Sequence, residues 1–309
     1  MGKIVISHIN GRELKGASGQ TILEIIRRYS IPHASLCGGR GRCTTCRIRV
    51  GQGSQHLPKP SKLEQFALNR IGAAPNVRLA CQTRPTNSLQ ISPLVPATLD
   101  IENSLRKGGV SGEERDVVSM FVDLRRSSRI SERHLPYDVL FILNQFFLEM
   151  SDALEASHGH YAQFEGDGLL ALYGLKRGLQ TGCLDAVEGA IDMQRRLNQL
   201  NKKLVDELKE PLEFGIGIHC GQAIVGTMGP PTSPNYSAIG DCINASARLE
   251  DMSKGLQCVL VISDDVVRHS GLSFGDFSSQ KVSLRGKQQS ILVYAVKDPM
   301  VISLDKKAG

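Results

Sequence analysis

Three cysteines lie within ten consecutive positions of a glycine-rich stretch, and a fourth follows after 34 further residues. These four residues are Cys37, Cys43, Cys46 and Cys81. A cluster of two irons and two sulfides needs four terminal thiolates, and a short loop supplies three of them where its backbone wraps around the cluster. Gly38, Gly39 and Gly41 permit that wrapping, because glycine adopts backbone conformations that other residues avoid. The spacing therefore predicts a 2Fe–2S cluster bound by these thiolates.

A zinc site is the alternative for this loop, because a Cys pair with two intervening residues, such as Cys43 and Cys46, is also common in zinc sites. Zinc sites usually use two well-separated pairs, whereas this chain has a tight triplet and a distant single cysteine. The spacing therefore favours iron over zinc. The remaining cysteines stand singly among apolar residues and are expected to be ordinary buried thiols. They are Cys183, Cys220, Cys242 and Cys258.

The segments around the cysteines resemble the 2Fe–2S ferredoxin family over residues 1–95. KIVISHIN and GRELKGA predict two short strands around the turn Asn10–Gly11, and TILEIIRRYS predicts a helix. The five residues between Cys37 and Cys43 match the adrenodoxin-like spacing, and RLACQ around Cys81 is also typical of the family. The resemblance implies a β-grasp fold, one-electron transfer and a redox donor or acceptor as partner.

The charge of the chain is divided unevenly along its length. Residues 1–95 hold 14 Lys and Arg against 3 Asp and Glu, whereas the rest holds 23 against 28. We interpret this as two domains of different origin; the alternative is that the basic part meets an acidic protein, an anionic membrane or the acidic part itself. No nucleic-acid partner is predicted.

The composition is that of a globular protein, with 41% hydrophobic and 22% charged residues. No apolar run approaches the roughly 18 residues of a membrane span. With no signal peptide in view, we expect a cytoplasmic location, with membrane attachment only through a segment upstream of this chain. Residues 96–115 lose the strand pattern and are expected to be a linker or a short transducer helix over residues 99–107. Residues 299–309 are expected to form a C-terminal tail.

Strands and helices alternate over residues 116–298, which predicts a second α+β domain with one substantial sheet. VVSMFVDL predicts a strand, residues 137–157 a long helix, and HYAQFEGDGLLALYG a hairpin around a Gly-Asp-Gly turn. CLDAVEGAIDMQRRLNQLNKKL predicts an amphipathic helix. LEFGIGIHC and AIVGTMG predict two strands, and KVSLRGKQQSILVYAV predicts a closing hairpin.

Two carboxylates and a helical pair carry the chemistry of this domain. Asp123 ends a hydrophobic strand and Asp167 stands at the tip of a hairpin, where strand-borne acids reach solvent. Two Asp within a few ångströms of each other would bind a pair of Mg²⁺ or Mn²⁺ ions, which prefer oxygen ligands. Asn244 and Arg248 are four residues apart and project from one face of a helix. An amide can orient a ribose, and a guanidinium can bind a phosphate.

FVDL, GDGLLALYG, GIGIHCG and IGDCINASARLE resemble the class III nucleotide cyclase domain over roughly residues 116–298. The resemblance implies a ferredoxin-like βαββαβ core and two Mg²⁺ or Mn²⁺ ions per active site. Asp123 and Asp167 would hold the metals with help from the carbonyl of Leu124. Asn244 and Arg248 would stabilise the transition state. Arg285 stands where the family often has a Lys that contacts the triphosphate.

The family also implies a site formed between two chains, one giving the Asp pair and the other Asn and Arg. Because this chain has all four, a symmetric homodimer would hold two complete sites.

Two positions differ from the adenylate-type pattern. Gln163 replaces a Lys that contacts adenine, and Ser237 replaces an Asp or Thr that accepts the adenine amino group. Gln has both a donor and an acceptor, and a hydroxyl rotates to serve either way. The pair fits adenine without excluding guanine, but the site lacks the acidic residue that would pair with guanine, which favours ATP.

The sequence therefore predicts a redox- or cluster-regulated adenylate cyclase that makes 3′,5′-cyclic AMP and pyrophosphate. The alternatives are a guanylate or dual-specificity cyclase, or an electron-transfer ferredoxin with a degenerate cyclase module used for dimerisation. A passive structural cluster on a constitutive cyclase also fits the sequence.

Overall fold

The computed structural model of this 309-residue chain describes residues 3–95, 111–229, 234–283 and 290–305. Its contacts divide the chain into two compact units, Met1–Gly109 and Val110–Gly309. The helix expected over residues 99–107 lies outside the described residues, and so does Arg285. Within the described residues, no helix combines the length and apolar character needed to cross a membrane.

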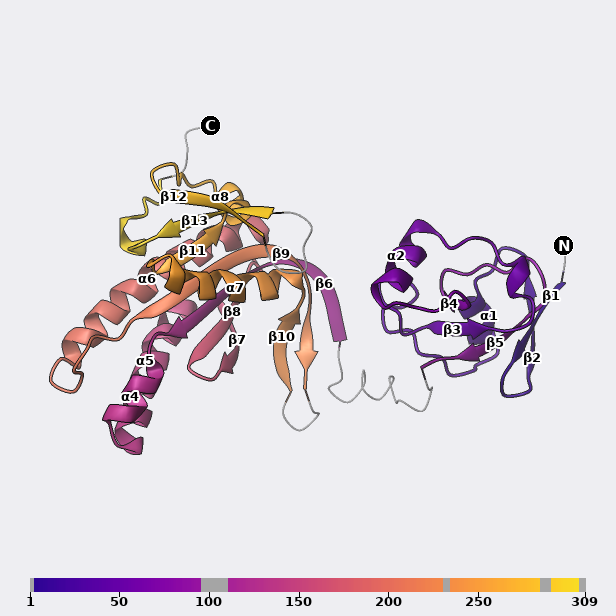
Figure 1. Ribbon diagram of the computed structural model, residues 1–309, viewed down its shortest axis with the longest axis horizontal. Helices are drawn as coiled ribbons and strands as arrows, with labels where there is room; N and C mark the ends of the chain where they lie inside the picture. The colour runs from indigo at the N-terminus through magenta and orange to yellow at the C-terminus, as the bar shows by residue number, and fades with distance from the viewer. Residues whose placement is uncertain (1–2, 96–110, 230–233, 284–289, 306–309) are drawn as a thin grey trace. The chain divides into compact units, whose positions relative to one another are not determined.

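The first unit is a five-stranded mixed sheet with two helices (Figure 1). Its strands lie in the order β2-β1-β5-β3-β4, with β1 and β5 parallel and the other neighbours antiparallel. In chain order the elements are β1 (Lys3–His8), β2 (Glu13–Ala17), α1 (Ile22–Arg28), β3 (Arg47–Val50), the short 3₁₀ helix η1 (Ser54–His56), α2 (Lys62–Arg70), β4 (Val77–Leu79) and β5 (Leu89–Pro93).

Helix α1 follows directly from its sequence. Thr21 and Glu24 form a capping box, in which each side chain accepts a hydrogen bond from the backbone N–H of the other. Ile22, Ile25 and Ile26 are fully buried against the sheet. The predicted β1–β2 turn is present, with Gly11 at a φ of 80°.

The second unit is built on an eight-stranded sheet in the order β12-β13-β11-β9-β6-β8-β7, with β10 paired to β9. Neighbouring strands are antiparallel except β11 and β9. Its elements are β6 (Ser111–Leu124), α4 (Ser127–Arg133), α5 (Pro136–Ala156), β7 (His160–Glu165), β8 (Gly168–Tyr173), α6 (Leu179–Lys203), β9 (Phe214–Met228), β10 (Asn235–Ile239), α7 (Asp241–Gly255), β11 (Leu260–Ser263), α8 (Asp264–Ser270), β12 (Ser278–Ser283), β13 (Ser290–Val296) and the 3₁₀ helix η2 (Pro299–Val301).

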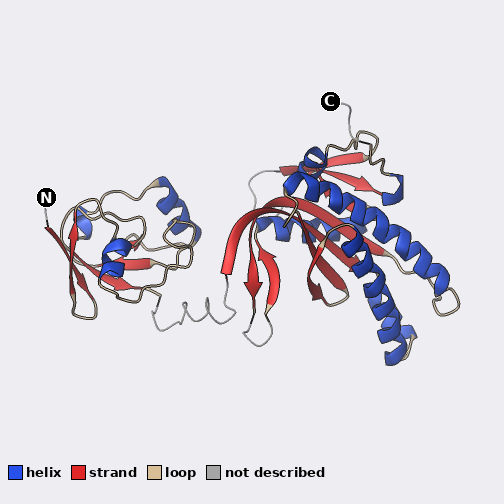
Figure 2. Cartoon of the chain, turned by 180° about the vertical axis from the view of Figure 1, so that it is seen from behind, coloured by secondary structure: helices blue, strands red, loops and turns tan. Residues whose placement is uncertain are grey.

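Helices cover both faces of this sheet. The long helices α5 and α6, together with α8, pack on one face; Figure 2 shows the long helices in front of the sheet. Even-numbered residues of β6 and β9, such as Met120 and Ile218, belong to that core. Helix α7 packs on the opposite face, where Val117 and Ala223 meet Cys242. Period-two alternation in the central strands therefore supplies two cores, one on each face.

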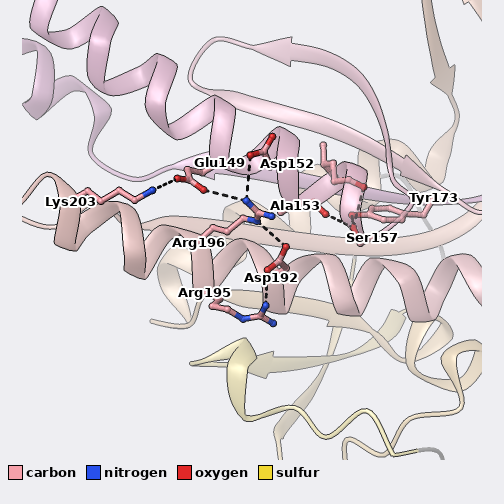
Figure 3. Close-up of polar contacts among 10 residues, drawn as sticks. Glu149, Asp152, Ala153, Ser157, Tyr173, Asp192, Arg195, Arg196 and Lys203 are labelled. Atoms are coloured by element: carbon pink, nitrogen blue, oxygen red, sulfur yellow. Dashed lines mark hydrogen bonds and ion pairs between the residues drawn. The ribbon is translucent and has the colours of Figure 1, made fainter.

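Polar contacts also join α5 to α6 (Figure 3). Arg196 Nε donates to Asp192 at 2.9 Å, and its Nη1 lies 3.4 Å from Glu149 and 3.5 Å from Asp152. The Lys203 ammonium lies 2.9 Å from Glu149. One guanidinium between three carboxylates holds the two helices at one relative position, because each carboxylate would otherwise repel its neighbours.

The α+β fold class predicted from the sequence is confirmed for both units, with three differences in detail. The two strands expected in LEFGIGIHC and AIVGTMG form one continuous strand, β9. Strand β6 begins at Ser111, within the segment expected to be a linker, because its first residues pair with the distal part of β9. Helices α2, α4 and α8 have seven to nine residues each and were not expected, since such short segments show little periodicity.

Gly217 lets α7 lie directly on β9. A Cβ atom at this position would lie 2.2 Å from the backbone nitrogen of Glu250 and 2.2 Å from the carbonyl oxygen of Ser246. Real Cβ atoms do not approach backbone this closely, so any larger residue would push the helix off the sheet.

We expect Gly217→Ala to lower the free energy of unfolding by about 1–3 kcal/mol, because the added methyl group overpacks the contact between α7 and β9. Chemical denaturation followed by circular dichroism measures this change. Gly255→Ala, in the last turn of the same helix, is the matched control, since a Cβ there meets nothing within 4 Å. Equal stability of the two variants would contradict the packing argument.

Candidate functional site

The four predicted cluster cysteines lie in two pairs in the first unit. The thiols of Cys37 and Cys43 hydrogen-bond each other, and so do those of Cys46 and Cys81. Cys46 and Cys81 are buried, whereas the other two are half-buried. In the described part of the chain, no group of three or more His, Cys, Asp or Glu side chains is placed to hold a single metal ion. A 2Fe–2S cluster takes two terminal thiolates on each iron, and two adjacent thiol pairs fit that donor set.

Local hydrogen bonds favour the thiolate form at two of these positions. The hydrogen bond from Cys46 lowers the pKa of Cys81 to about 6, against the effect of burial, and Gln82 Nε2 lies 3.5 Å from the same sulfur. The pKa of Cys46 is raised by its partner and by burial. Burial acts to raise the pKa of Cys37, but hydrogen bonds from Cys43 and from backbone N–H groups outweigh it and lower the pKa.

The loop backbone wraps toward the thiols as the glycines predicted. Gly38, Gly39 and Gly41 have φ angles of 70°, 99° and 71°, in the left-handed region. N–H groups of the loop reach Cys37, and the N–H of Gly41 reaches Cys81. A Cβ atom at Gly41 would lie 2.6 Å from the end of the Leu63 side chain, so a larger residue would have to displace that side chain in addition to adopting a positive φ.

A buried ion pair positions the segment that carries Cys81. Arg78 donates to both oxygens of Glu64, at 2.9 and 2.8 Å. Glu64 also accepts from the backbone N–H of Leu79 and from the hydroxyl of Thr83. Because every oxygen of Glu64 is satisfied, the pair fixes α2 to β4 two residues before the cysteine.

The two predicted catalytic carboxylates come together in the second unit. Asp123 is the last residue but one of β6, and its register partner in β8 is Gly168, the residue that follows Asp167 in the β7–β8 turn. Burial raises the pKa of Asp123, the negative charge of Asp167 raises it further, and Lys254 opposes both. Two carboxylates therefore lie close together in a partly buried place, and the positive charge of Lys254 does not fully compensate them.

Helix α7 brings a third acid and one base to Asp123, and neither was predicted from the sequence. The Lys254 ammonium lies 3.4 Å from Asp123 Oδ2. Burial and the charge of Asp123 raise the pKa of Glu250 to about 7. The available signal was the spacing of Glu250 and Lys254, which are four residues apart and share a helix face.

Arg125 is a further residue that the sequence analysis did not identify. It follows Leu124, whose side chain is buried in the core. Its Nη2 donates to Ser253 Oγ at 2.9 Å and to the carbonyl of Cys258. Arg125 thus ties the end of β6 to the end of α7.

Asn244 and Arg248 lie on α7 as predicted, four residues apart, Asn244 exposed and Arg248 half-buried. The α7 residues whose charges interact with Asp123 include Glu250, Asp251 and Lys254, from the last two turns of the helix. A Cβ atom at Gly215, the register partner of Asp123, would meet Glu250, so Asp123 lies beside the later turns of α7. Asn244 lies near the start of the same helix.

Gln163 and Ser237 lie on neighbouring strands. Gln163 is next to a bulge in β7, and Ser237 is a buried residue of β10. Asn235 Nδ2 donates to the carbonyl of Ala162 at 2.5 Å, which joins the two strands beside both residues. The predicted base-contacting residues are thus close together, whereas Arg285 lies outside the described residues.

Comparison with known families agrees with both units. Residues 110–298 match the adenylate and guanylate cyclase catalytic domain, and residues 7–86 match the 2Fe-2S iron-sulfur cluster binding domain. The first match covers more than half of the chain. The chain belongs to the adenylate and guanylate cyclase family. The chain also carries a 2Fe–2S ferredoxin-type domain, as the cysteine spacing predicted.

Relatives similar in sequence include adenylate cyclases. The chain is 29% identical over 289 residues to an adenylate cyclase of Anabaena cylindrica, an alignment covering 90% of this chain and 55% of that protein. Adenylate cyclase 1 of Rhizobium meliloti is 29% identical over 160 residues, covering 52% of this chain and 24% of that protein. The chain thus spans about half or less of the length of these relatives. Because 289 residues exceed either unit, the Anabaena alignment extends over both.

Solved structures share the fold of the second unit. The guanylyl cyclase Cya2 matches with a TM-score of 0.56 and 28% identity, over 63% of this chain and all of that one. The adenylyl cyclase CyaB from P. aeruginosa matches with a TM-score of 0.53 and 22% identity, over 60% of this chain and 96% of that one. At 22% identity, the match to CyaB shows a shared fold and nothing further.

Cys46→Ser is expected to abolish the visible absorption of the purified protein, because one iron loses a buried terminal thiolate. Absorption spectra and iron analysis measure the loss. Cys242→Ser is the matched control, since that thiol donates to the carbonyl of Gln222 (3.4 Å) and a hydroxyl can do the same. A colourless wild-type protein that contains zinc and no iron would refute the assignment.

Proposed function

We propose that this cyclase converts ATP into 3′,5′-cyclic AMP and pyrophosphate with Asp123 and Asp167 as its metal ligands. The observation that carries the proposal is that the two carboxylates come together where β6 ends and β8 begins. Oxygen ligands suit Mg²⁺ and Mn²⁺. Burial and the negative charge of Asp167 raise the pKa of Asp123, and a cation would compensate that charge. Two such ions, when bound, supply activation of the ribose 3′-hydroxyl and neutralisation of the leaving pyrophosphate.

The chain's own residues would divide the remaining work between two subunits. Asn244 would orient the ribose, and Arg248 would stabilise charge on the phosphate in the transition state. Within one chain, a Cβ atom at Gly215, the register partner of Asp123, would meet Glu250, whereas a Cβ atom at Gly221 would meet Cys242 near the start of α7. This direction of the helix supports a site in which Asn244 and Arg248 serve the carboxylates of a second copy, so that a homodimer holds two sites.

Recognition of the base would fall to Gln163 and Ser237. Their adjacent positions on β7 and β10 allow both to contact one base edge, with a donor and acceptor from the amide and either role from the hydroxyl. The adenylate cyclase of Anabaena cylindrica supports ATP as substrate, because its alignment covers both units. Guanylate or dual specificity is the alternative, supported by the similarity to the guanylyl cyclase Cya2.

The cluster would serve as a sensor, since cyclisation transfers no electron. Its four thiols belong to a unit that is separate from the catalytic one. One-electron reduction changes the cluster charge by one unit, and a redox donor or acceptor would be the partner that delivers this signal. A passive cluster, or an electron-transfer protein that retains its cyclase unit for dimerisation, would respond differently in the two tests below.

Asp123→Ala and Arg248→Ala chains are each expected to lack cyclase activity, and their equimolar mixture is expected to recover about a quarter of it. Random pairing makes half of the dimers mixed, and each mixed dimer has one intact site of two. Cyclic nucleotide formation from ATP and, separately, GTP with Mn²⁺ measures recovery and specificity. Asp123→Ala mixed with Asp167→Ala is the control, because no pairing of these chains restores a complete site. An inactive wild-type chain would favour the dimerisation role.

Turnover is expected to differ at least several-fold between dithionite-reduced and air-oxidised protein at low salt. Coupling energies of about 1–3 kcal/mol change an equilibrium between dimer geometries roughly five- to 150-fold. Coupling that crosses solvent weakens as salt is added. The same assay on Cys46→Ser is the control, in which the difference should disappear. Equal rates in the two redox states would assign the cluster a structural role.

A further inference from the structure

Lys254 is the positive charge that the structure places against the metal-binding carboxylate. Its ammonium lies 3.4 Å from Asp123 Oδ2 and 3.8 Å from Asp251. Two further carboxylates are nearby: the charge of Asp167 acts on Asp123, and the charge of Glu250 acts on Lys254. One ammonium thus stands among four acids, in the place where the proposed function puts divalent cations.

Glu250 cannot move out of this group. The residue is 6% exposed, and its Oε1 is buried without a hydrogen-bond partner among the described residues. A Cβ atom at Gly215 would lie 2.5 Å from that oxygen, and Gly215 is the register partner of Asp123. The Glu250 carboxylate therefore lies beside Asp123 on the same face of the sheet, and the repulsion between the two acids is built into the packing.

Lys254, by contrast, can move away at little cost. Its side chain is 50% exposed, and that of Asp123 is 28% exposed. A long, half-exposed lysine reaches water by rotation about its own side-chain bonds. A cation that approaches Asp123 from solvent therefore meets the ammonium of Lys254, which it can displace. The carboxylate of Glu250 stays in place beside Asp123.

We propose that Lys254 is a built-in counter-ion of the metal site, which neutralises Asp123 and Glu250 in the metal-free protein and is exchanged for the incoming divalent cation. The inference rests on the proposed function, because it takes Asp123 as a metal ligand. Lys254 is then a positioning residue that sets the affinity of the site for metal. It stabilises the metal-free state and opposes metal binding.

Lys254→Gln tests this exchange through two changes of opposite sign. Without the ammonium, Mn²⁺ no longer has to displace the ion pair of Lys254 with Asp123, and its dissociation constant is expected to fall about fivefold, as for a pair largely screened by water. The metal-free variant is expected to unfold at a lower temperature than the wild type, and saturating Mn²⁺ is expected to remove most of that difference. Calorimetric titration of Mn²⁺ into the full-length protein without nucleotide, and thermal unfolding with and without Mn²⁺, measure the two effects.

Three further variants make the outcome specific. Lys254→Arg keeps the charge and should bind Mn²⁺ within about twofold of the wild type. Lys202→Gln removes the same charge from an exposed position of α6 and should leave both quantities unchanged. Asp123→Ala should abolish the high-affinity binding; if it does not, the metal site and with it the proposed function fail. If Asp123→Ala abolishes binding while Lys254→Gln leaves the dissociation constant unchanged or raises it, the counter-ion role alone is overturned.

Discussion

The close contact of helix α7 with strands β6 and β9 determines how the groups of the catalytic unit are arranged. Glycine at 217 leaves room for the helix backbone, and glycine at 215 leaves room for the side chains of Glu250 and Ser253. The helix is also hydrogen-bonded to the sheet, because Ser246 donates to the carbonyl of Ser119 at 3.0 Å and Arg125 donates to Ser253. Glu250 is therefore buried beside Asp123 although both are acids. The electrostatic imbalance of the site is therefore a consequence of backbone packing.

In the first unit, which carries the predicted cluster site, the negative groups are the cysteine sulfur atoms, and these need hydrogen-bond donors around them. Loop N–H groups, brought round by left-handed glycines, point at Cys37, while Gln82 approaches Cys81 from the other side. The buried Glu64–Arg78 pair holds the strand that leads to Cys81. Removing either partner would leave an uncompensated buried charge, at a cost of about 3–5 kcal/mol. Cluster geometry thus depends on an ion pair that contacts no thiol.

Sequence reasoning predicts features that depend on residue order and misses those that depend on tertiary contact. Four cysteines at a diagnostic spacing, and two acids at the ends of recognisable strands, predict candidate sites before any fold is known, and the structure brings the two acids together. The roles of Glu250 and Lys254 exist because α7 lies on β9, and no local pattern distinguishes them from an ordinary i, i+4 pair on a solvated helix. The sequence divides β9 in two because Gly221 and Gln222 interrupt its run of apolar residues, although the strand continues through them.

In the proposed dimer, helix α7 would contribute to both active sites and would therefore link them. The last turns of α7 interact with Asp123 of their own chain, through Lys254 and Glu250. Its first turns carry Asn244 and Arg248, which in the shared arrangement serve the carboxylates of the other subunit. A change in the charge balance at one Asp123 therefore acts on a helix that supplies the second site. Because the helix backbone already lies against the sheet at Gly217, the helix has no room to move closer to it, and an adjustment along the helix axis would reach Asn244 and Arg248 in the proposed dimer.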